Sequence, residues 1–340
     1  MVTGACSNCH TMHNSQDGNT VVGSAQNALT SDSCVGCHSN TGGETIISLG
    51  SSQVPIVYNI TEPTYPPDGS TSSTLAGGNF YWVAQGDDSL GHNVYGISAA
   101  DSTLAAAPGS STVCSPCHDS LAVLDTGNPA YPNGGCQGCH LVAHHAGDSA
   151  VVVDASVGSY RFLGDLMNRF LVGTDSGRGV QGIEAADWEQ APSSTNHNTY
   201  AGTASGYVAD FGVFLDTSSI GQFCSGCHGN FHHQMNTESD FSGAWIRHPS
   251  DVVLPSDVDK EYQAYTVYNP LAPVAKPVLS AGIKDSPDVV PGTDVVTCLS
   301  CHRAHGSPYP DMLRWDYQNC KTQIANSDCG CFVCHTQKDD

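Results

Sequence analysis

The residues of this chain that could do chemistry are its cysteines and histidines, 16 of each in 340 residues. Seven times they stand in the order Cys-x-x-Cys-His. Two thiols at this spacing can reach the two vinyl groups on one edge of a porphyrin, and the histidine that follows can ligate the iron. Composition alone would produce about 0.04 such patterns in a chain of this length. The sequence therefore predicts a multihaem c-type cytochrome.

The seven motifs supply the predicted attachment residues and proximal ligands of seven covalently bound c-type haems. The attachment cysteines are Cys6, Cys9, Cys34, Cys37, Cys114, Cys117, Cys136, Cys139, Cys224, Cys227, Cys298, Cys301, Cys331 and Cys334, and the proximal ligands are His10, His38, His118, His140, His228, His302 and His335. Two cysteines, Cys320 and Cys329, are left over. Because haem is attached to thiols outside the cytoplasmic membrane, we expect this last pair to form a disulfide.

Nine histidines lie outside the motifs, and four of them form two adjacent pairs. Counting each pair as one position gives seven positions for seven irons, which predicts bis-histidine ligation at every haem. The predicted distal ligands are His13, His92, His144 or His145, His197, His232 or His233, His248 and His305. Methionine could also ligate and would raise a haem's potential, but the supply of histidine is sufficient.

In four places a second histidine follows the haem histidine by three or four residues, as His13 follows His10 and His305 follows His302. On a helical turn such residues lie on one face. The two ligands of one iron must instead approach from opposite faces of the porphyrin. We therefore expect each second histidine to serve a different, neighbouring haem, which predicts haems packed in a continuous row.

Composition bounds the fold and the partners. Seven haems leave about 49 residues for each, too few for a large aliphatic core around every porphyrin. We expect one haem-wrapped unit over residues 1–340, mostly irregular coil with short helices at the haem motifs and a few short strands. The formal net charge of −22 makes nucleic acid and anionic lipid poor partners. No apolar run reaches the length of a membrane span, and we expect an exported, mature chain.

Local patterns add finer expectations. The alternation in 79–83 predicts a short strand. A short helix is expected at 185–189, a loop at 173–182, and an extended connection with short strands at most over 249–297. The sequence His-Asn-x-Tyr occurs at 92–95 and at 197–200, ahead of the third and fifth motifs. This repeat predicts a distal-ligand loop that is used twice.

The chain resembles the polymerising extracellular multihaem cytochromes of metal-reducing microbes, the cytochrome nanowires of the OmcE/OmcS type. The likeness lies in 6–15, 160–163, 187–189 and 197–200, and it is strongest in 224–232, 247–249 and 298–315. It implies a filament with a continuous haem chain. It also implies that His13 ligates a haem of the adjacent subunit, with the haem held by His302 favoured over the same chain's second haem.

The leading hypothesis is therefore a subunit of an extracellular conductive filament, a head-to-tail homopolymer. It would carry electrons from upstream donor cytochromes to extracellular acceptors. A soluble, monomeric electron carrier is the first alternative. A multihaem reductase is the second, and it requires an iron with an open sixth position. Because all seven motifs end in histidine and distal histidines suffice for every iron, we expect no enzymatic role.

Overall fold

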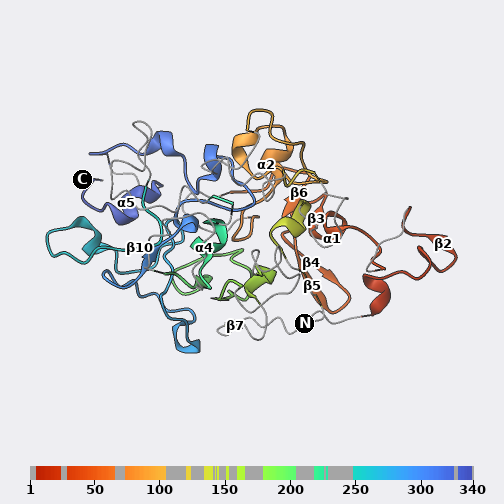
Figure 1. Cartoon of the computed structure of the whole chain (residues 1–340), viewed down its shortest axis with the longest axis horizontal. Helices are drawn as coiled ribbons and strands as arrows, with labels where there is room; N and C mark the ends of the chain where they lie inside the picture. Colours follow the sequence, from red (N-terminus) through yellow and green to blue (C-terminus); the bar gives the residue numbers. More distant parts are fainter. Residues whose placement is uncertain are drawn as a thin grey trace.

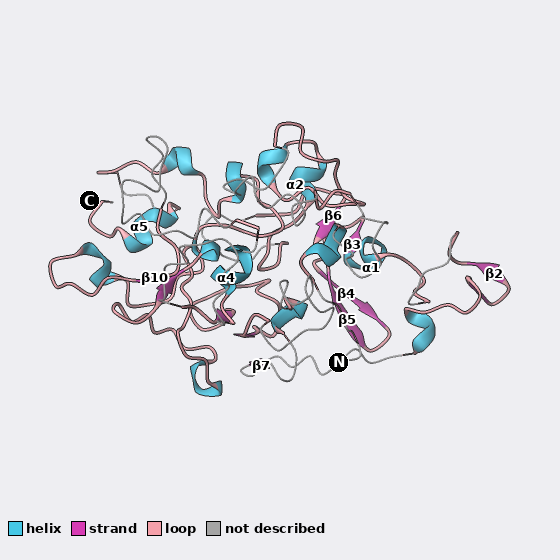
Figure 2. Ribbon diagram, viewed as in Figure 1, coloured by secondary structure: helices cyan, strands magenta, loops and turns pink. Residues whose placement is uncertain are grey.

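The computed structural model shows an elongated molecule made largely of loops (Figures 1 and 2). It describes residues 5–23, 29–65, 73–104, 120–123, 134–140, 142, 144, 151–152, 159–164, 179–203, 218–225, 227–228, 248–324 and 328–338. Regular structure within these residues comes in pieces of two to six residues. The predicted fold class, irregular chain with short elements, is confirmed.

Helical turns occur at every described haem motif. The α-helices are α1 (Cys34–His38), α2 (Tyr81–Ala84), α4 (Ile220–Ser225) and α5 (Gly330–Cys334). The 3-10 turns are η1 (Cys6–Asn8), η2 (Asp88–Leu90), η4 (Gly135–Gly138), η6 (Tyr160–Phe162), η9 (Glu261–Ala264), η10 (Ala281–Ile283), η11 (Cys298–Ser300), η12 (Pro310–Met312) and η13 (Tyr317–Asn319). Six of these elements contain the first cysteine of a motif, as the sequence predicts. The third motif lies outside the described residues.

The strands are short and pair locally for the most part. They are β1 (Ser15–Gln16), β2 (Asn19–Thr20), β3 (Ser39–Asn40), β4 (Ile46–Leu49), β5 (Ser52–Pro55), β6 (Tyr58–Asn59), β7 (Val151–Val152), β8 (Gly182–Ile183), β9 (Thr199–Tyr200), β10 (Val252–Val253) and β11 (Val295–Val296). β1–β2, β4–β5 and β10–β11 are antiparallel pairs, β3–β6 is parallel, and β7–β8–β9 forms a three-stranded sheet. Gly50, at φ +61°, makes the turn between β4 and β5.

The strand predicted at 79–83 is wrong, because the segment forms helix α2. Ala84 N–H donates to Phe80 O at 3.0 Å, which closes a helical turn. Asn79 starts it, since its side-chain oxygen accepts from Tyr81 N–H at 3.0 Å. Phe80 and Val83 lie on one side of this turn and are both buried. Their spacing of three is a helical period, which the alternation in the sequence concealed.

The helix predicted at 185–189 is also wrong, because the chain turns there. Trp188 N–H donates to Ala185 O and Gln190 N–H donates to Asp187 O, both with turn spacing. Trp188 and Glu189 then adopt φ of +51° and +61°, a left-handed conformation that a right-handed helix cannot contain. The extended connection at 249–297 is largely confirmed, with η9 and η10 added to it. Of the loop expected at 173–182, the part before 179 lies outside the described residues.

The described hydrophobic residues gather in small clusters and form no single core. One cluster joins Tyr160, Tyr200, Ile220 and Val295, and a second joins Leu254, Tyr265, Tyr268 and Val289. A third lies around Phe80 and Val94, and a fourth around Leu271 and Trp315. Each contains, or touches through partly buried residues, a haem-motif residue or its immediate neighbour. The clusters therefore line the places where porphyrins would complete the packing.

The N-terminal part of the chain extends away from the rest of the molecule. η1, β1 and β2 form the projection at the right of Figure 1, opposite the end that carries α5. β1 and β2 are joined by Asp17 and Gly18, at φ of +49° and +80°, the signature of a tight hairpin turn. Over the described residues, no helix is long and apolar enough to span a membrane.

The predicted disulfide is present: Cys320 and Cys329 are bonded, nine residues apart. We expect the double change Cys320→Ser and Cys329→Ser to lower the free energy of unfolding by about 2–3 kcal/mol, because the bond removes loop entropy from the unfolded chain. Denaturant unfolding of the haem-loaded protein measures this difference. Equal unfolding midpoints, or two reactive thiols in the denatured unreduced wild type, would contradict it.

Candidate haem sites

The six described Cys-x-x-Cys-His motifs, which with the third we number sites 1 to 7 in chain order, share one local geometry. In each of sites 1, 4, 5, 6 and 7, the histidine N–H donates to the carbonyl of the first cysteine at 2.8–3.0 Å. At site 2 the motif is helix α1 itself. None of the twelve described motif cysteines takes part in a disulfide. One tight turn therefore presents two thiols and an imidazole, the set that covalent haem attachment needs.

Four pairs of histidine rings lie with their centroids at similar separations. The ring centroids are 6.3 Å apart for His38 and His144, 6.0 Å for His92 and His228, 6.2 Å for His140 and His305, and 6.3 Å for His248 and His335. A metal–imidazole bond is about 2 Å long, so two rings on opposite sides of one metal ion have centres about 6 Å apart. Each gap therefore has the width that a bis-histidine iron requires.

Each of these pairs joins one proximal histidine to one predicted distal histidine. His38, His140, His228 and His335 belong to sites 2, 4, 5 and 7, and their partners come from elsewhere in the chain. Within the first adjacent pair of histidines, it is His144 that faces site 2. His145, His118, His232 and His233 lie outside the described residues, as do Cys114 and Cys117.

The shared segments link the sites into a row. His140 belongs to site 4, and His144, four residues later, faces site 2. His305, three residues after the haem histidine of site 6, faces His140 of site 4. The thiols of Cys34 and Cys136, from sites 2 and 4, are within hydrogen-bonding reach of each other. Sites 2, 4 and 6 are thus neighbours in space although they are separated in sequence.

The helical premise behind the spacing argument is wrong at sites 1 and 6. The helical turn ends before the haem histidine: His10 forms a β-bridge with Thr30, and His302 forms one with Leu313. His305 is held instead through its backbone N–H, which donates to Gly77 O at 2.7 Å. At these two sites the segment that leads to the second histidine is therefore not a helical turn.

Hydrogen bonds fix the tautomer of the ligand rings. Nδ1 lies 2.7–3.2 Å from a backbone carbonyl in six histidines, pairing His38 with Pro55, His92 with Ala304, His140 with Arg161, His197 with Ser193, His248 with Pro249 and His302 with Asp311. A carbonyl can only accept, so Nδ1 carries the proton. Nε2 is then left with the lone pair that a metal ion needs.

Two of these carbonyls come from strained turns that the residue patterns did not reveal. Arg161 and Phe162 have φ of +48° and +58°, and Asp311 and Met312 have φ of +59° and +56°. In both turns the first left-handed residue supplies the carbonyl to a haem histidine. Left-handed backbone costs about 1–2 kcal/mol per residue. The one feature that the two turns share in sequence is a leucine directly after each, at 163 and 313. A single common residue type is too weak a signal to predict a left-handed turn.

Burial favours the neutral form of several of the candidate ligand rings, which is the form that iron ligation requires. It lowers the pKa of His92, His140 and His302, with hydrogen bonds to backbone opposing the effect. It lowers the pKa of His305 to about 3, with His140 adding to the effect. The His305 ring stacks on Phe80 at 4.7 Å, and its buried Nδ1 has no hydrogen-bond partner. This orphaned nitrogen favours a ring that is held by a metal ion.

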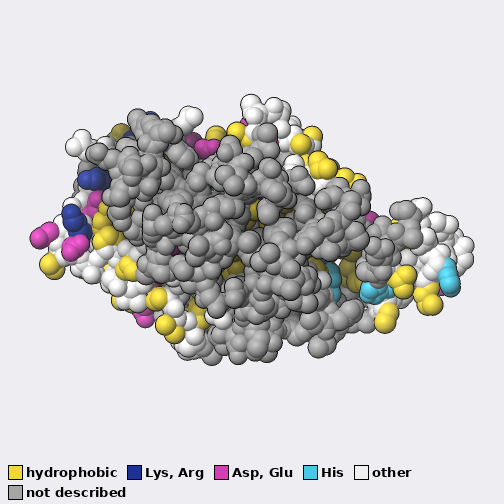
Figure 3. All heavy atoms as spheres, viewed as in Figure 1, with side chains coloured by type: hydrophobic (Ala, Val, Ile, Leu, Met, Phe, Trp, Pro, Cys, Tyr) yellow, Lys and Arg dark blue, Asp and Glu magenta, His cyan; other side chains and the backbone are white. Residues whose placement is uncertain are grey.

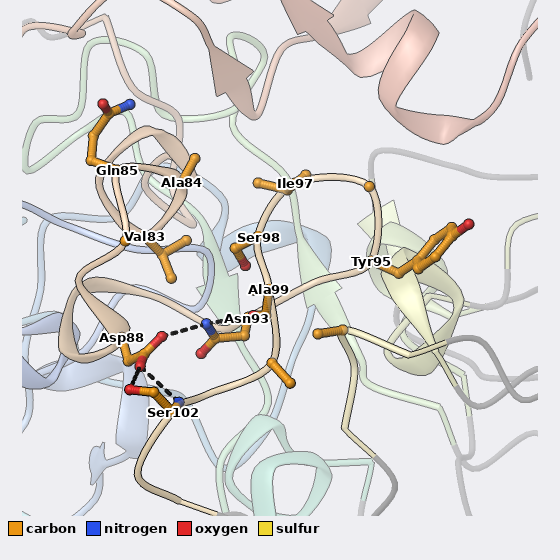
Figure 4. Close-up of a pocket in the computed structure, with 14 residues that line it drawn as sticks. Val83, Ala84, Gln85, Asp88, Asn93, Tyr95, Ile97, Ser98, Ala99 and Ser102 are labelled. Carbon is orange, nitrogen blue, oxygen red and sulfur yellow. Dashed lines mark hydrogen bonds between the residues drawn. The ribbon is translucent and has the colours of Figure 1, made fainter.

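A hydrogen-bonded loop positions His92. Asp88 accepts from the Asn93 amide at 2.8 Å with one oxygen, and from Ser102 N–H and Oγ–H at 2.9 and 2.8 Å with the other (Figure 4). The network encloses one side of an open cavity of about 700 Å³ that is also lined by Val83 and Ile97. It ties the residue next to His92 to η2.

The repeated His-Asn-x-Tyr loop is used differently in its two copies. His92 faces His228 of site 5. The ring of His197 stacks on Tyr268, with centroids 3.5 Å apart. Among the described histidines, none faces it across a gap of the width seen at the four pairs. The structure therefore places the first copy beside an identified site, while the distal role of the second stays a prediction.

Asp88 generates a prediction of pH dependence. Hydrogen bonds from Ser102 and then Asn93 hold its pKa below the ordinary value of 3.8. Its contribution to stability is therefore present above 3.8 and is lost as the pH falls through the lowered folded-state pKa. We expect Asp88→Asn to be less stable than wild type at neutral pH, since an amide offers one acceptor oxygen instead of two, and the gap to close in acid. Thermal unfolding against pH measures it; a gap that is constant with pH would contradict it.

The pairing of His305 with site 4 generates a second prediction. We expect His305→Ala to create one carbon-monoxide-binding, high-spin haem per chain, because the change removes the ring opposite His140. Optical titration of the reduced protein with carbon monoxide counts such haems. Phe80→Leu is the matched control, since it removes the ring stacked on His305 but no ligand. The pairing is wrong if both variants bind as little carbon monoxide as wild type.

Comparisons with known proteins bear on the haem motifs. The family model described as a doubled CXXCH motif matches residues 1–43 and 291–340. The C-type cytochrome OmcS of Geobacter sulfurreducens is 26% identical over 385 residues, an alignment that covers 95% of this chain and 81% of OmcS. Its sequence therefore aligns with nearly the whole of the chain, including the middle.

Two solved structures share the fold. The Outer Membrane Cytochrome S filament of Geobacter sulfurreducens superposes with a TM-score of 0.56 at 20% identity, over 96% of this chain and 86% of that one. The OmcS nanowire of the same organism superposes with a TM-score of 0.51 at 17% identity, over 99% and 92%. The motifs, the sequence and the fold agree that the chain is a homologue of OmcS and fits a c-type cytochrome of the OmcS type, with covalently bound haem.

Proposed function

We propose that this chain is the repeating subunit of an extracellular filament that carries electrons over long distances through seven bis-histidine c-type haems. The observation that carries the proposal is the linking of sites 2, 4 and 6 through His144 and His305, which pass from one site to the next. The homology to OmcS and the fold shared with its filaments support it. The whole chain, 1–340, would then be one haem-organised unit.

The residues of the chain would do three things. The motif cysteines anchor each haem and the proximal histidines bind one side of its iron. Histidines from distant segments close the other side, which leaves no position for a substrate and favours an electron carrier over a reductase. When bound, a c-type haem supplies reversible one-electron exchange between ferric and ferrous iron.

Close packing of the sites would let this exchange continue along the chain. Thiols of sites 5 and 6, Cys224 and Cys298, are within hydrogen-bonding reach of each other. Those of sites 6 and 7 are near enough for Cys331 to raise the pKa of Cys301, an effect second to burial. Among the described sites, 2 and 4, 4 and 6, 5 and 6, and 6 and 7 are therefore each close together. Upstream donor cytochromes and extracellular acceptors would serve as the ends of the path.

His13 is the proposed joint between subunits. It lies on the N-terminal projection, just before β1, it is exposed, and its φ is +58°. Met12 beside it is 71% exposed, and histidine and hydrophobic side chains are visible on this projection in Figure 3. Within the described part of the chain, no second histidine ring faces His302. A ligand from a neighbouring subunit would complete that site.

Such a contact sets the form of the assembly. The N-terminal projection and site 6 are different surfaces, so the contact is head to tail. A head-to-tail contact that does not close produces an open helical filament instead of a dimer. Because a ligand of one subunit would complete an iron site of the next, the row of haems would continue across the junction.

We expect the native protein to form filaments in negative-stain images, and His13→Ala to yield haem-loaded monomers with one carbon-monoxide-binding haem per chain. The change removes a ligand from the next subunit's iron but leaves every thioether in place. Mass spectrometry checks for seven haems in both proteins.

Met12→Ala is the matched control, because it trims the same exposed turn without removing a ligand, and we expect it to form filaments. Native protein that stays monomeric would overturn the filament. Normal filaments of His13→Ala with no open haem would overturn the joint alone.

A further inference from the structure

One candidate ligand histidine differs from six others in the hydrogen-bond partner of its Nδ1. Six described ligand candidates donate from Nδ1 to a neutral backbone carbonyl, as His302 does to Asp311 O at 2.7 Å. His335 of site 7 instead has Nδ1 2.9 Å from the carboxylate oxygen Oε1 of Glu261. Of these seven hydrogen bonds, this is the one whose acceptor carries a full negative charge.

The carboxylate is held in place by its surroundings. Glu261 begins η9, and its side chain is 13% exposed. Its Oε2 accepts from Gln337 N–H at 3.4 Å, and its backbone oxygen accepts from the Thr336 hydroxyl at 2.6 Å. The ring of Tyr262 packs against that of His335, with centroids 5.2 Å apart. These contacts fasten η9 to the chain just after α5, so the Glu261–His335 pair is a built feature of the fold.

A charged acceptor changes what the imidazole gives to the iron. When Nδ1–H donates to a carboxylate, the ring gains anionic character and its Nε2 becomes a stronger electron donor. A stronger donor stabilises ferric iron more than ferrous iron, and hydrogen bonding around the ligands is one of the means by which proteins set redox potential. A neutral carbonyl at the same position has a weaker effect.

We propose that Glu261 is a tuning residue that lowers the midpoint potential of the haem at site 7. This inference rests on the proposed function for the haem loading and the bis-histidine ligation of that site by His335 and His248, whose rings are 6.3 Å apart. Glu261 contacts the His335 ring through Nδ1 and would act through that ring. Reduction of site 7 by one electron is then less favourable than it would be with a neutral acceptor.

The Glu261–His335 pair lies toward one end of the molecule, so a lowered potential at site 7 would affect electron flow along the filament. α5, which carries site 7, lies at the end of the molecule opposite the N-terminal projection (Figure 1). The electron path within a subunit would therefore be asymmetric, with a site of lowered potential toward one end. In a head-to-tail polymer this asymmetry would repeat once per subunit with the same polarity.

The test is a spectroelectrochemical titration of the haem-loaded Glu261→Gln variant. Glutamine keeps the shape and an acceptor oxygen but removes the charge, so we expect a single one-electron component, about one seventh of the total absorbance change, to move to a more positive potential. Glu261→Asp keeps the charge on a shorter arm, and we expect a smaller shift in the same direction. Hyperfine-shifted proton resonances should change for one haem.

Asp259→Asn is the matched control, because Asp259 is exposed and its replacement removes the same charge two residues away while leaving the Glu261–His335 hydrogen bond in place. We expect its titration to match wild type. The inference is overturned if Glu261→Gln leaves all components in place, or if Asp259→Asn shifts them equally. Images of the same preparations separate the two proposals: absent wild-type filaments overturn the filament, whereas intact filaments with unchanged potentials overturn only the role of Glu261.

Discussion

Two ligands of one iron must approach from opposite faces of a porphyrin, and the architecture of this chain depends on that constraint. A motif that anchors a haem covers one face only, so the other face has to be reached by chain from elsewhere. His144 and His305 meet this need by standing a few residues beyond one motif while facing the histidine of another. In the proposed ligation, the same residues that complete one site would also fix the position of the next.

The constraint also explains the scarcity of regular structure. A helix long enough to be stable by itself would carry the distal histidine away on its own face, whereas short turns and extended segments can be directed to a neighbouring site. The chain accordingly uses single helical turns at the motifs and small apolar clusters between them. The haems would supply the packing that a larger hydrophobic core supplies in other proteins. The disulfide between Cys320 and Cys329 adds a covalent link near the C-terminal end.

Hydrogen bonds to Nδ1 add a second level of control. Backbone carbonyls set the tautomer at six histidines, and they need no particular side chain, so loops of any composition can supply them. Two of these carbonyls, at Arg161 and Asp311, require left-handed turns that cost stability. At His335 the acceptor is instead the carboxylate of Glu261, which lies where η9 packs against the chain just after α5. In the proposed function, chemically identical haems would thus lie in environments that are not equivalent.

The order of residues along the chain is enough to specify the chemistry of the sites. Cys-x-x-Cys-His is a local pattern: one turn of backbone places its thiols and imidazole, so the kind of cofactor, the short helices and the irregular fold follow from the residues alone. The two spare cysteines predicted the disulfide for a similar reason, since few partners were available. The alternation of residue types at 79–83 wrongly predicted a strand. The hydrogen bond from Tyr81 N–H to the Asn79 side chain and the burial of Phe80 and Val83 favour a helical turn there.

Which rings meet depends on the three-dimensional packing of the whole chain. His92 and His228, or His38 and His144, are distant in sequence, and nothing in their neighbours states the pairing. The acceptors of Nδ1 were equally hidden, because a backbone carbonyl belongs to every residue and becomes an acceptor for a ligand only through its position. Ligand identity is a property of side-chain type and can be read along the chain, whereas ligand pairing is a property of distance in space, which long-range packing alone creates.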